Sequence, residues 1–421
     1  MTDSLAQPIR VLHLNAGACG GAALGAVGLH ESLLDLGVTS TFLYGNGPRE
    51  CTISSAERMI QSQILSAGIE KVLPRFETGL VRILSGRRGL PFSLGQVGNP
   101  LFQRRALLQN SDIIHLHWVN GSMLSLRQIA AFNKPVVWTL RDEWPYTGGC
   151  HYTGECQKFE MECGQCPMLN SHRLYDLSTF IQRQKTRLPE DIRYVGISDW
   201  ITRRAKRSSL LRTATVTTIL NSINPSFFES DGSTERGELR RRLQLPEKAT
   251  ILLAGALDLD SPFKGYEILQ HIKPDARRDL HLLTFGSISD DLKDSISIPA
   301  THLGPVPQQM ELKEVYRAAD LFLAPSHQES FGKTLAEAAA CGLPTVCYDV
   351  GGPAEIVIHE QTGFKAEPFN TDQVIAYCMQ LVDDVGLRTR IGHDARRLSV
   401  RFKPARAAKE YLQLYREVLN R

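Results

Sequence analysis

LFLAPSHQESFGKTLAEAAACGLPTVCYDVGGPAE, residues 321–355, combines a strand, a loop and a helix in the order of a βα unit. The apolar run at its start predicts a buried strand that ends at Ser326. A loop with Glu329 follows, and an alanine-rich helix is expected over residues 331–341, where a glycine stops it. The free N–H groups and the dipole at the start of such a helix attract an anion such as a diphosphate.

Two glutamates flank the predicted turn, Glu329 in the loop and Glu337 in the second turn of the helix. On one continuous helix they would lie about 80° out of alignment. With Glu329 in the loop, both carboxylates can address one ligand, and carboxylates accept hydrogen bonds from paired sugar hydroxyls. Alone, two such glutamates are more typical of a solvated loop and a helix surface. The residues around them must therefore show whether they form a ligand site.

Short apolar runs alternate with helical patterns along the whole chain, which predicts βαβ units and parallel sheets. Strands are expected at residues 9–14, 38–44, 112–118, 135–140, 194–198, 250–256, 279–286, 320–326 and 344–349. The polar segment 220–238 separates the two series and reads as a linker.

The alternation therefore predicts an α/β chain of two Rossmann-like, doubly wound domains, residues 1–222 and 223–403. The helix predicted over 404–421 either caps the second domain or crosses back to the first. Ligands of open α/β sheets bind beyond the carboxyl ends of the strands, so the site is expected in a cleft that the two domains face.

Composition excludes several classes of protein. The chain has 421 residues, with 48 basic and 45 acidic side chains and a net charge of +3, which argues against a nucleic-acid binder. Five of the nine cysteines are scattered, as in proteins of a reducing compartment. The uncharged stretch 11–30 is interrupted by His13, Asn15 and glycines, so we expect neither a signal peptide nor a membrane helix there. The protein is expected to be cytoplasmic.

Residues 321–355 resemble the donor-site signature of retaining GT-B glycosyltransferases of family 4. The residues that match it are Glu329, Ser330, Phe331, Gly332, Glu337, Ala338, Ala340, Gly342 and Pro344, with Val350, Gly351, Gly352 and Glu355 after them. The resemblance implies that Glu329 contacts the donor sugar and that Glu337 holds the ribose hydroxyls. It further implies that backbone groups of Phe331, Gly332, Lys333 and Thr334 meet the donor phosphates and sugar.

Two further elements of that family have counterparts here. Lys264 matches the lysine of the basic pair that neutralises the diphosphate, whereas the usual arginine is absent, since the strand runs into Gly255-Ala256-Leu257. Gly20 and Gly21 occupy the position of the family's glycine-rich loop. We assign no D-x-D-type metal motif and expect no cofactor to be required for catalysis. Without a nucleophilic carboxylate, front-face attack by the acceptor is the implied retaining route.

Four cysteines, Cys150, Cys156, Cys163 and Cys166, follow the pattern C-x5-C-x6-C-x2-C. The last pair has the short spacing of zinc knuckles, and four soft ligands could form a closed structural zinc site, with His151 as a substitute ligand. Unpaired thiols packed in a loop fit the pattern equally well, and disulfides fit a reducing compartment less well.

The same segment, residues 138–169, resembles a subset of family 4 that builds bacterial exopolysaccharides, the colanic acid glycosyltransferases. Arg141 stands where that subset commonly has histidine, and arginine does not deprotonate in proteins. Asp142 remains the candidate for the acceptor hydroxyl, and the alternative is that it caps the following turn.

Basic residues gather in the part of the chain where the resemblance is weakest: Arg58, Lys71, Arg75, Arg82, Arg87, Arg88, Arg104 and Arg105. Apolar residues lie among them near helical spacing. The pattern fits a helical pair of the domain core slightly better than an amphipathic surface on anionic lipid. Contact with the inner face of the membrane stays open.

These observations together predict transfer of a sugar from a UDP- or GDP-sugar to a saccharide, with polyprenyl-linked saccharides among the options. Exopolysaccharide biosynthesis is the expected context. The alternative is a non-catalytic protein of the same fold that binds nucleotide sugars, and the departure at Arg141 and the missing arginine near residue 256 keep this alternative open. A phosphorylase is disfavoured, because no convincing pyridoxal-phosphate lysine is visible.

Overall fold

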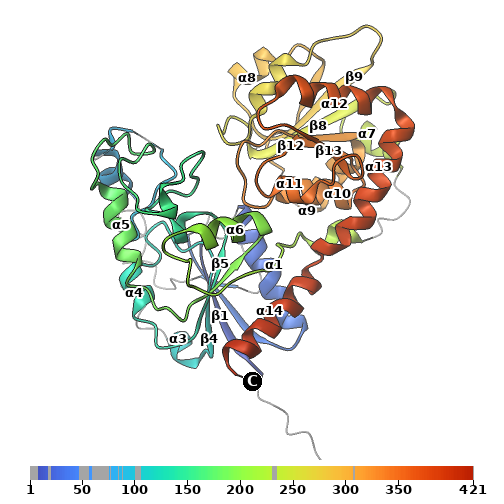
Figure 1. Ribbon diagram of the computed structural model, residues 1–421. Coiled ribbons are helices and arrows are strands. Elements are labelled where there is room, and N and C mark those ends of the chain that lie inside the picture. The colour runs from blue at the N-terminus through green and yellow to red at the C-terminus, as the bar shows by residue number, and fades with distance from the viewer. Residues whose placement is uncertain are drawn as a thin grey trace, which may run out of the picture. The chain divides into compact units, whose positions relative to one another are not determined.

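The computed structural model describes residues 8–17, 20–46, 56–58, 75, 77–83, 85–87, 89–99, 106–229, 235–306 and 309–420. The chain divides into two compact units (Figure 1). Unit 1 comprises Met1–Leu220 together with Ala405–Arg421, and unit 2 comprises Asn221–Pro404.

Unit 1 is built on a seven-stranded parallel sheet in the order β3-β2-β1-β4-β5-β6-β7. Its strands are β1 (Arg10–Gly17), β2 (Thr39–Asn46), β3 (Ala56–Arg58), β4 (Ile113–Leu116), β5 (Val136–Leu140), β6 (Arg193–Gly196) and β7 (Val216–Thr218). The central strands are buried almost continuously, as is typical of a parallel sheet covered on both faces.

Side-chain caps set the starts of several helices in unit 1. The helices are α1 (Gly21–Asp35), α3 (Ala106–Asn110), α4 (Leu126–Ala130), α5 (Leu177–Lys185), α6 (Asp199–Arg207) and α14 (Pro404–Val418). Ser125 and Asp176 form capping boxes at α4 and α5, and Ser198 caps α6. These bonds satisfy N–H groups that have no partner within the helix.

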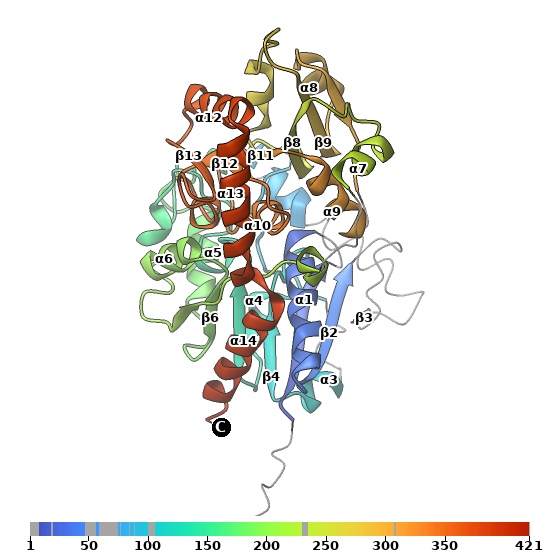
Figure 2. The same cartoon turned by 90° about the vertical axis from the view of Figure 1, so that its right-hand side faces the viewer.

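The last helix, α14, packs on the sheet of unit 1 (Figure 2). Ala408, Tyr411 and Tyr415, three and four residues apart, form its buried stripe, and they share one hydrophobic cluster with Val11 and Ile113 of β1 and β4. A segment from the end of the chain therefore completes the core of the first unit.

Unit 2 contains a six-stranded parallel sheet in the order β10-β9-β8-β11-β12-β13. Its strands are β8 (Thr250–Asp258), β9 (Leu280–Ser287), β10 (Ala300–His302), β11 (Leu321–Ala324), β12 (Thr345–Tyr348) and β13 (Gly363–Ala366). Its helices are α7 (Arg236–Arg242), α8 (Asp290–Ser295), α9 (Gln309–Ala318), α10 (Lys333–Ala340), α11 (Pro353–Ile356), α12 (Thr371–Asp383) and α13 (Val385–Leu398).

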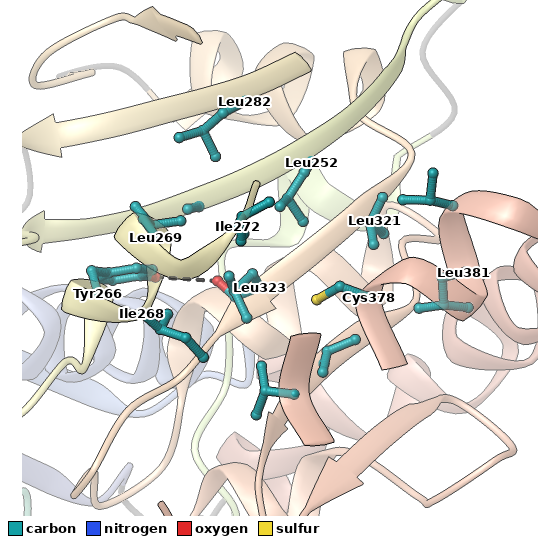
Figure 3. Close-up of a cluster of buried hydrophobic side chains, with 14 of the residues drawn as sticks. Leu252, Tyr266, Ile268, Leu269, Ile272, Leu282, Leu321, Leu323, Cys378 and Leu381 are labelled. Carbon is teal, nitrogen blue, oxygen red and sulfur yellow. Dashed lines mark hydrogen bonds between the residues drawn. The ribbon is translucent and has the colours of Figure 1, made fainter. Parts of the chain in front are cut away.

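One face of this sheet carries a large apolar core (Figure 3). Leu252 of β8 and Leu323 of β11 lie next to the short helical segment Tyr266–His271, and Leu381 of α12 belongs to the same cluster. The Tyr266 hydroxyl donates to the backbone carbonyl of Gly255 at 2.9 Å, so a polar group within the core is satisfied.

In both sheets the order of the strands reverses next to the first strand, between β1 and β4 in unit 1 and between β8 and β11 in unit 2. This order confirms the prediction of two doubly wound, Rossmann-like halves. Loops at the carboxyl ends of the strands beside such a switch point are the usual ligand sites. None of the described helices is long and apolar enough to cross a membrane.

Candidate active site

Lys264 and Glu329 lie close together because β8 and β11 are hydrogen-bonded neighbours, so the loops after these strands meet at one edge of the sheet. The Lys264 ammonium is 2.9 Å from Glu329 Oε2, and the Ser326 hydroxyl donates to the same oxygen at 3.2 Å. Both charged side chains remain partly exposed. The pair is therefore accessible to a ligand at the switch point of unit 2.

The glycines of the VGG element allow two loops to touch through their backbones. The N–H of Gly352 donates to the carbonyl of Glu329 at 2.9 Å. A Cβ atom on Gly352 would lie 2.5 Å from Phe331 Cα, and one on Gly351 would lie 2.6 Å from the Glu329 carbonyl oxygen. No larger residue fits at either position without moving the loop that carries Glu329.

Helix α10 begins at Lys333, two residues later than the sequence pattern predicted. Gly332 is the residue before the helix, and its φ of 98° is a left-handed conformation that glycine adopts readily. Because this conformation is not helical, the helix cannot begin earlier than Lys333. Phe331 is buried and meets the Phe402 ring edge-on at 5.7 Å, so its backbone is held in place. Thr334 lies half-buried in the first turn.

Glu337 is 2% exposed and faces the interior of unit 2. Its Oε2 accepts a hydrogen bond from the Tyr316 hydroxyl at 3.1 Å, and Lys333 Nζ lies 3.6 Å from its Oε1. Burial raises the pKa of Glu337 above its ordinary value, Lys333 and Tyr316 oppose that effect, and the negative charge of Glu329 adds to it. The two glutamates thus lie near enough to influence each other.

Gly20 and Gly21 open helix α1 in unit 1, after β1. Gly20 precedes the helix with φ of 89°, and no described atom lies within 4 Å of a Cβ built on either glycine. These positions therefore present backbone beside open space at the switch point of their own sheet.

Asp142 follows β5 in unit 1, and its carboxylate is fully engaged. Oδ1 accepts the backbone N–H of Trp144 at 3.0 Å, which is the turn-capping role. Oδ2 accepts the Trp118 indole N–H at 2.7 Å and lies 2.6 Å from His151 Nδ1. The other ring nitrogen of His151 lies 2.9 Å from the Ser93 hydroxyl. Asp142 is thus positioned to orient an imidazole as well as to cap a turn.

Arg141 is buried against a group of histidines that the sequence interpretation did not bring together. Its Nη2 lies 3.4 Å from His117 Nδ1, and His117 Nε2 lies 3.0 Å from His13 Nδ1. Burial lowers the pKa of Arg141 to about 10. The histidines of HLH, residues 115–117, alternate on a strand and so face one side of the sheet, which was the available signal.

Glu143 anchors the cysteine-rich loop and was also missed. Its fully buried carboxylate lies 2.6 Å from Arg204 Nε of α6 and accepts the backbone N–H of Thr153 at 2.8 Å. The Tyr146 hydroxyl donates to it at 3.0 Å. The Glu143–Arg204 ion pair joins the loop after β5 to α6, the helix after β6.

The four cysteines of the same loop are free thiols, and all four line one small cavity of about 20 Å³. Cys150, Cys163 and Cys166 are buried, whereas Cys156 is partly exposed. The zinc prediction made from their spacing stays a prediction at this point.

The candidate residues fall into two groups. Lys264, Glu329, Glu337 and the segment 331–334 converge at the switch point of unit 2. The glycine pair, Asp142 and the cysteines belong to unit 1. Of the basic set between residues 58 and 105, Lys71, Arg88, Arg104, Arg105 and the side chain of Arg58 lie outside the described residues, and so does most of the lipid-surface prediction.

Comparison with proteins of known sequence shows which family unit 2 resembles. Residues 238–398 match the family model described as Glycosyl transferases group 1. A D-inositol 3-phosphate glycosyltransferase of Thermobispora bispora is 31% identical over 222 residues, which cover 49% of this chain and 51% of that protein. An uncharacterised glycosyltransferase of Methanocaldococcus jannaschii is 28% identical over 326 residues, 72% of this chain and 75% of that protein. This chain thus spans about half the length of the first of these relatives.

Comparison with solved structures concerns the whole chain. HepE of Anabaena, solved with UDP and glucose, superimposes with a TM-score of 0.64 at 15% identity, over 97% of this chain and 99% of that chain. Sucrose-phosphate synthase of Thermosynechococcus elongatus gives a TM-score of 0.67 at 18% identity, over 98% and 99%. The chain therefore has the GT-B fold, and its second unit contains a glycosyl transferases group 1 domain.

Proposed function

We propose that this chain is a retaining glycosyltransferase of family 4 type that transfers a sugar from a nucleotide-sugar donor to a saccharide or lipid-linked saccharide. The observation that carries the proposal is the Lys264–Glu329 pair at the carboxyl ends of β8 and β11, beside the start of α10. A positive side chain and the N-terminus of a helix there favour a diphosphate, while the carboxylate of Glu329 can accept sugar hydroxyls.

In the proposed reaction, the bond between the anomeric carbon and the diphosphate oxygen breaks, and the acceptor oxygen bonds to the same face of that carbon. The acceptor proton passes to the departing diphosphate. Lys264 and the first turn of α10 stabilise the negative charge that develops on the leaving group. This is electrostatic catalysis by groups already held in place, and it requires no covalent intermediate on the protein.

Glu337 is proposed to hold the ribose. Its buried carboxylate is ordered by Tyr316 and Lys333, and it would accept the ribose hydroxyls when it is ionised. A metal-binding role for the D-x-D spacing at Asp258 and Asp260 is disfavoured, because both oxygens of the Asp260 carboxylate already accept hydrogen bonds from Ser289. The backbone N–H of Ser289 donates at 2.6 Å and the Ser289 hydroxyl donates at 2.5 Å. We therefore keep the prediction that the transfer requires no metal ion.

The donor and the acceptor are proposed as classes. HepE was solved with UDP-glucose, so UDP-hexoses are the first donors to test, with GDP-sugars beside them. The resemblance of residues 138–169 to exopolysaccharide enzymes favours a growing saccharide, free or polyprenyl-linked, as acceptor. A lipid-linked acceptor would place a cytoplasmic enzyme at the inner face of the membrane.

The test is release of UDP or GDP from a panel of nucleotide sugars, with and without saccharide acceptors. Acceptor-dependent release that is lost in Glu329→Gln supports the proposal. Glu247→Gln is the matched control, since this exposed glutamate pairs with Arg241 at 3.7 Å on the surface and should leave turnover unchanged. Unchanged turnover in Glu329→Gln would remove Glu329 from the mechanism. Donor binding without turnover would favour the non-catalytic alternative, which the replacement of a common histidine by Arg141 keeps open.

A further inference from the structure

Cys150, Cys156, Cys163 and Cys166, here named the cysteine quartet, come from a loop that returns to one point of unit 1. All four line the same cavity of about 20 Å³, next to Phe159, and none is bridged to another cysteine. Four soft ligands around a space of this size form the donor set of a closed tetrahedral zinc site. Convergence of the whole quartet is decided by the fold, since sixteen positions separate the first cysteine from the last.

The backbone around the quartet presents hydrogen-bond donors to sulfur. The N–H groups of Met168 and Leu169 donate to the Cys166 sulfur, and that of Gly148 donates to the Cys163 sulfur. N–H donors two and three residues after a cysteine stabilise a thiolate more than a thiol, because bonds to a charged acceptor are stronger. Burial nevertheless raises the pKa of Cys163 to about 12 and that of Cys166 above its ordinary value, so the N–H groups are donors that would support these sulfurs as thiolates once a metal ion is bound.

The turn between the last two cysteines is held in an uncommon conformation. Gly164 has φ of 149° and Gln165 has φ of 43°, the latter in the left-handed region that residues with a side chain rarely adopt. A Cβ atom on Gly164 would lie 2.0 Å from the Leu174 carbonyl oxygen, so glycine is required there. Lys158 Nζ donates at 3.0 Å to the carbonyls of both turn residues and holds the turn closed.

A buried lysine lies beside the quartet. The Lys185 side chain of α5 is buried and donates to the backbone carbonyls of Trp144 and Thr147. No ion pair among the described residues includes it, and the acidic groups near enough to act on it electrostatically are Cys150, Cys163 and Asp142. Burial lowers the pKa of Lys185 to about 7, so a positive charge on it is costly here. A divalent ion bound by four thiolates would carry a net charge of −2 and would stabilise the ammonium form of this lysine.

We propose that the cysteine quartet binds one structural Zn²⁺, which fixes the loop that carries Asp142 and His151. In a tetrahedral site with Zn–S distances near 2.3 Å, the four sulfurs would lie about 3.8 Å from one another. The proposal is independent of the sugar-transfer function, since it concerns the architecture of unit 1.

A group of histidines competes with the quartet as a metal site. The ligand atoms of His13, His115 and His117, here named the histidine trio, all lie within 4.8 Å of one another, and the sulfurs of the quartet are not gathered so tightly. The nitrogens of His115, however, already lie 2.6 Å from the Tyr415 hydroxyl and 2.7 Å from Thr139 Oγ1. Arg141 adds positive charge next to His117. Hydrogen bonds and a neighbouring cation thus disfavour a metal in the trio.

The experiment measures metals in the full-length chain purified without chelator or affinity metal, by elemental analysis. We expect about one zinc per chain, which a mercurial thiol reagent should release stoichiometrically. The double variant Cys163→Ser/Cys166→Ser should lose the zinc, whereas Cys341→Ser, at the end of α10 in unit 2, should retain it.

A second measurement does not depend on the variant folding. Removal of the metal from the wild-type chain by a chelator should lower the melting temperature of unit 1, and added Zn²⁺ should restore it. Wild-type protein with zinc at background level, with stoichiometric iron instead, or with disulfides among the quartet by mass spectrometry would overturn the proposal. So would full zinc retention in the folded double variant.

Discussion

Unit 1 should lose stability steeply between pH 7 and pH 5, because the histidine trio is buried in its neutral form. Each of the three side chains is fully buried, and burial lowers the pKa of each well below the usual 6.5. The nearby positive charge of Arg141 acts in the same direction. In the unfolded chain, three ordinary imidazoles would titrate near pH 6.5.

The sign of the effect follows from the direction of these shifts. A group with a lowered pKa in the folded state contributes stability that is fully present above its unfolded pKa and is lost as the pH falls below it. Three protons bound only by the unfolded chain give a slope of about 4 kcal/mol per pH unit below pH 6. Integrated from pH 7 to pH 5, the loss is on the order of 5–6 kcal/mol, comparable with the whole stability of a typical domain.

Urea denaturation followed by tryptophan fluorescence measures this effect in unit 1 specifically. All four tryptophans, at positions 118, 138, 144 and 200, belong to that unit. His13→Asn removes one of the three proton sites and should reduce the slope to about 2.7 kcal/mol per pH unit.

A slope of about 1.4 kcal/mol per pH unit or less for the wild-type chain between pH 6 and pH 5 would refute this reasoning. It would mean that at least two members of the trio accept a proton in the folded state. The window lies above the pH at which ordinary carboxylates titrate, so their contribution remains small.

Three further predictions concern unit 2. Asp320→Ala leaves the buried Arg240 guanidinium, now 2.6 Å from the Asp320 carboxylate, without its charge partner, so thermal denaturation should show a loss of about 3–5 kcal/mol. Gly352→Ala places a methyl group 2.5 Å from neighbouring backbone and should weaken donor binding in calorimetry, whereas Gly28→Ala, with no described atom within 4 Å, should bind like the wild type. Because the pKa of Glu337 is raised, donor affinity should decrease as the pH is lowered, and the decrease should begin at a higher pH than for an ordinary carboxylate; Glu337→Gln should remove that dependence.

Much of the fold was predictable from local patterns. Strands that are buried on both faces appear as continuous apolar runs, and the expected runs at residues 250–256 and 344–349 correspond to β8 and β12. The three-residue strands β3, β7 and β10 were not predicted, because a segment of that length has no measurable periodicity. The start of α10 was placed early, since the positive φ of Gly332 becomes visible only in the structure.

The donor-side residues were identified because their pattern is local. Glu329 and Glu337 lie within one βα unit, so their spacing and surroundings are visible in sequence. Direct contacts between separate βα units were not predicted: the Lys264–Glu329 pair joins residues 65 positions apart, and the Glu143–Arg204 pair joins residues 61 positions apart. Parallel strands bring such loops together only when the strand order is known.

The amino-acid sequence by itself determined the α/β class, the two doubly wound halves and the donor-side motif, since each depends on side-chain period or on residues close along the chain. Only the tertiary structure decided that α14 packs on unit 1, that His13 meets His117 across two strands, and that four cysteines line one cavity. The physical reason is that burial and charge act through space. A histidine, a lysine or a thiol acquires its chemistry from neighbours that the order of strands, and not the order of residues, places around it.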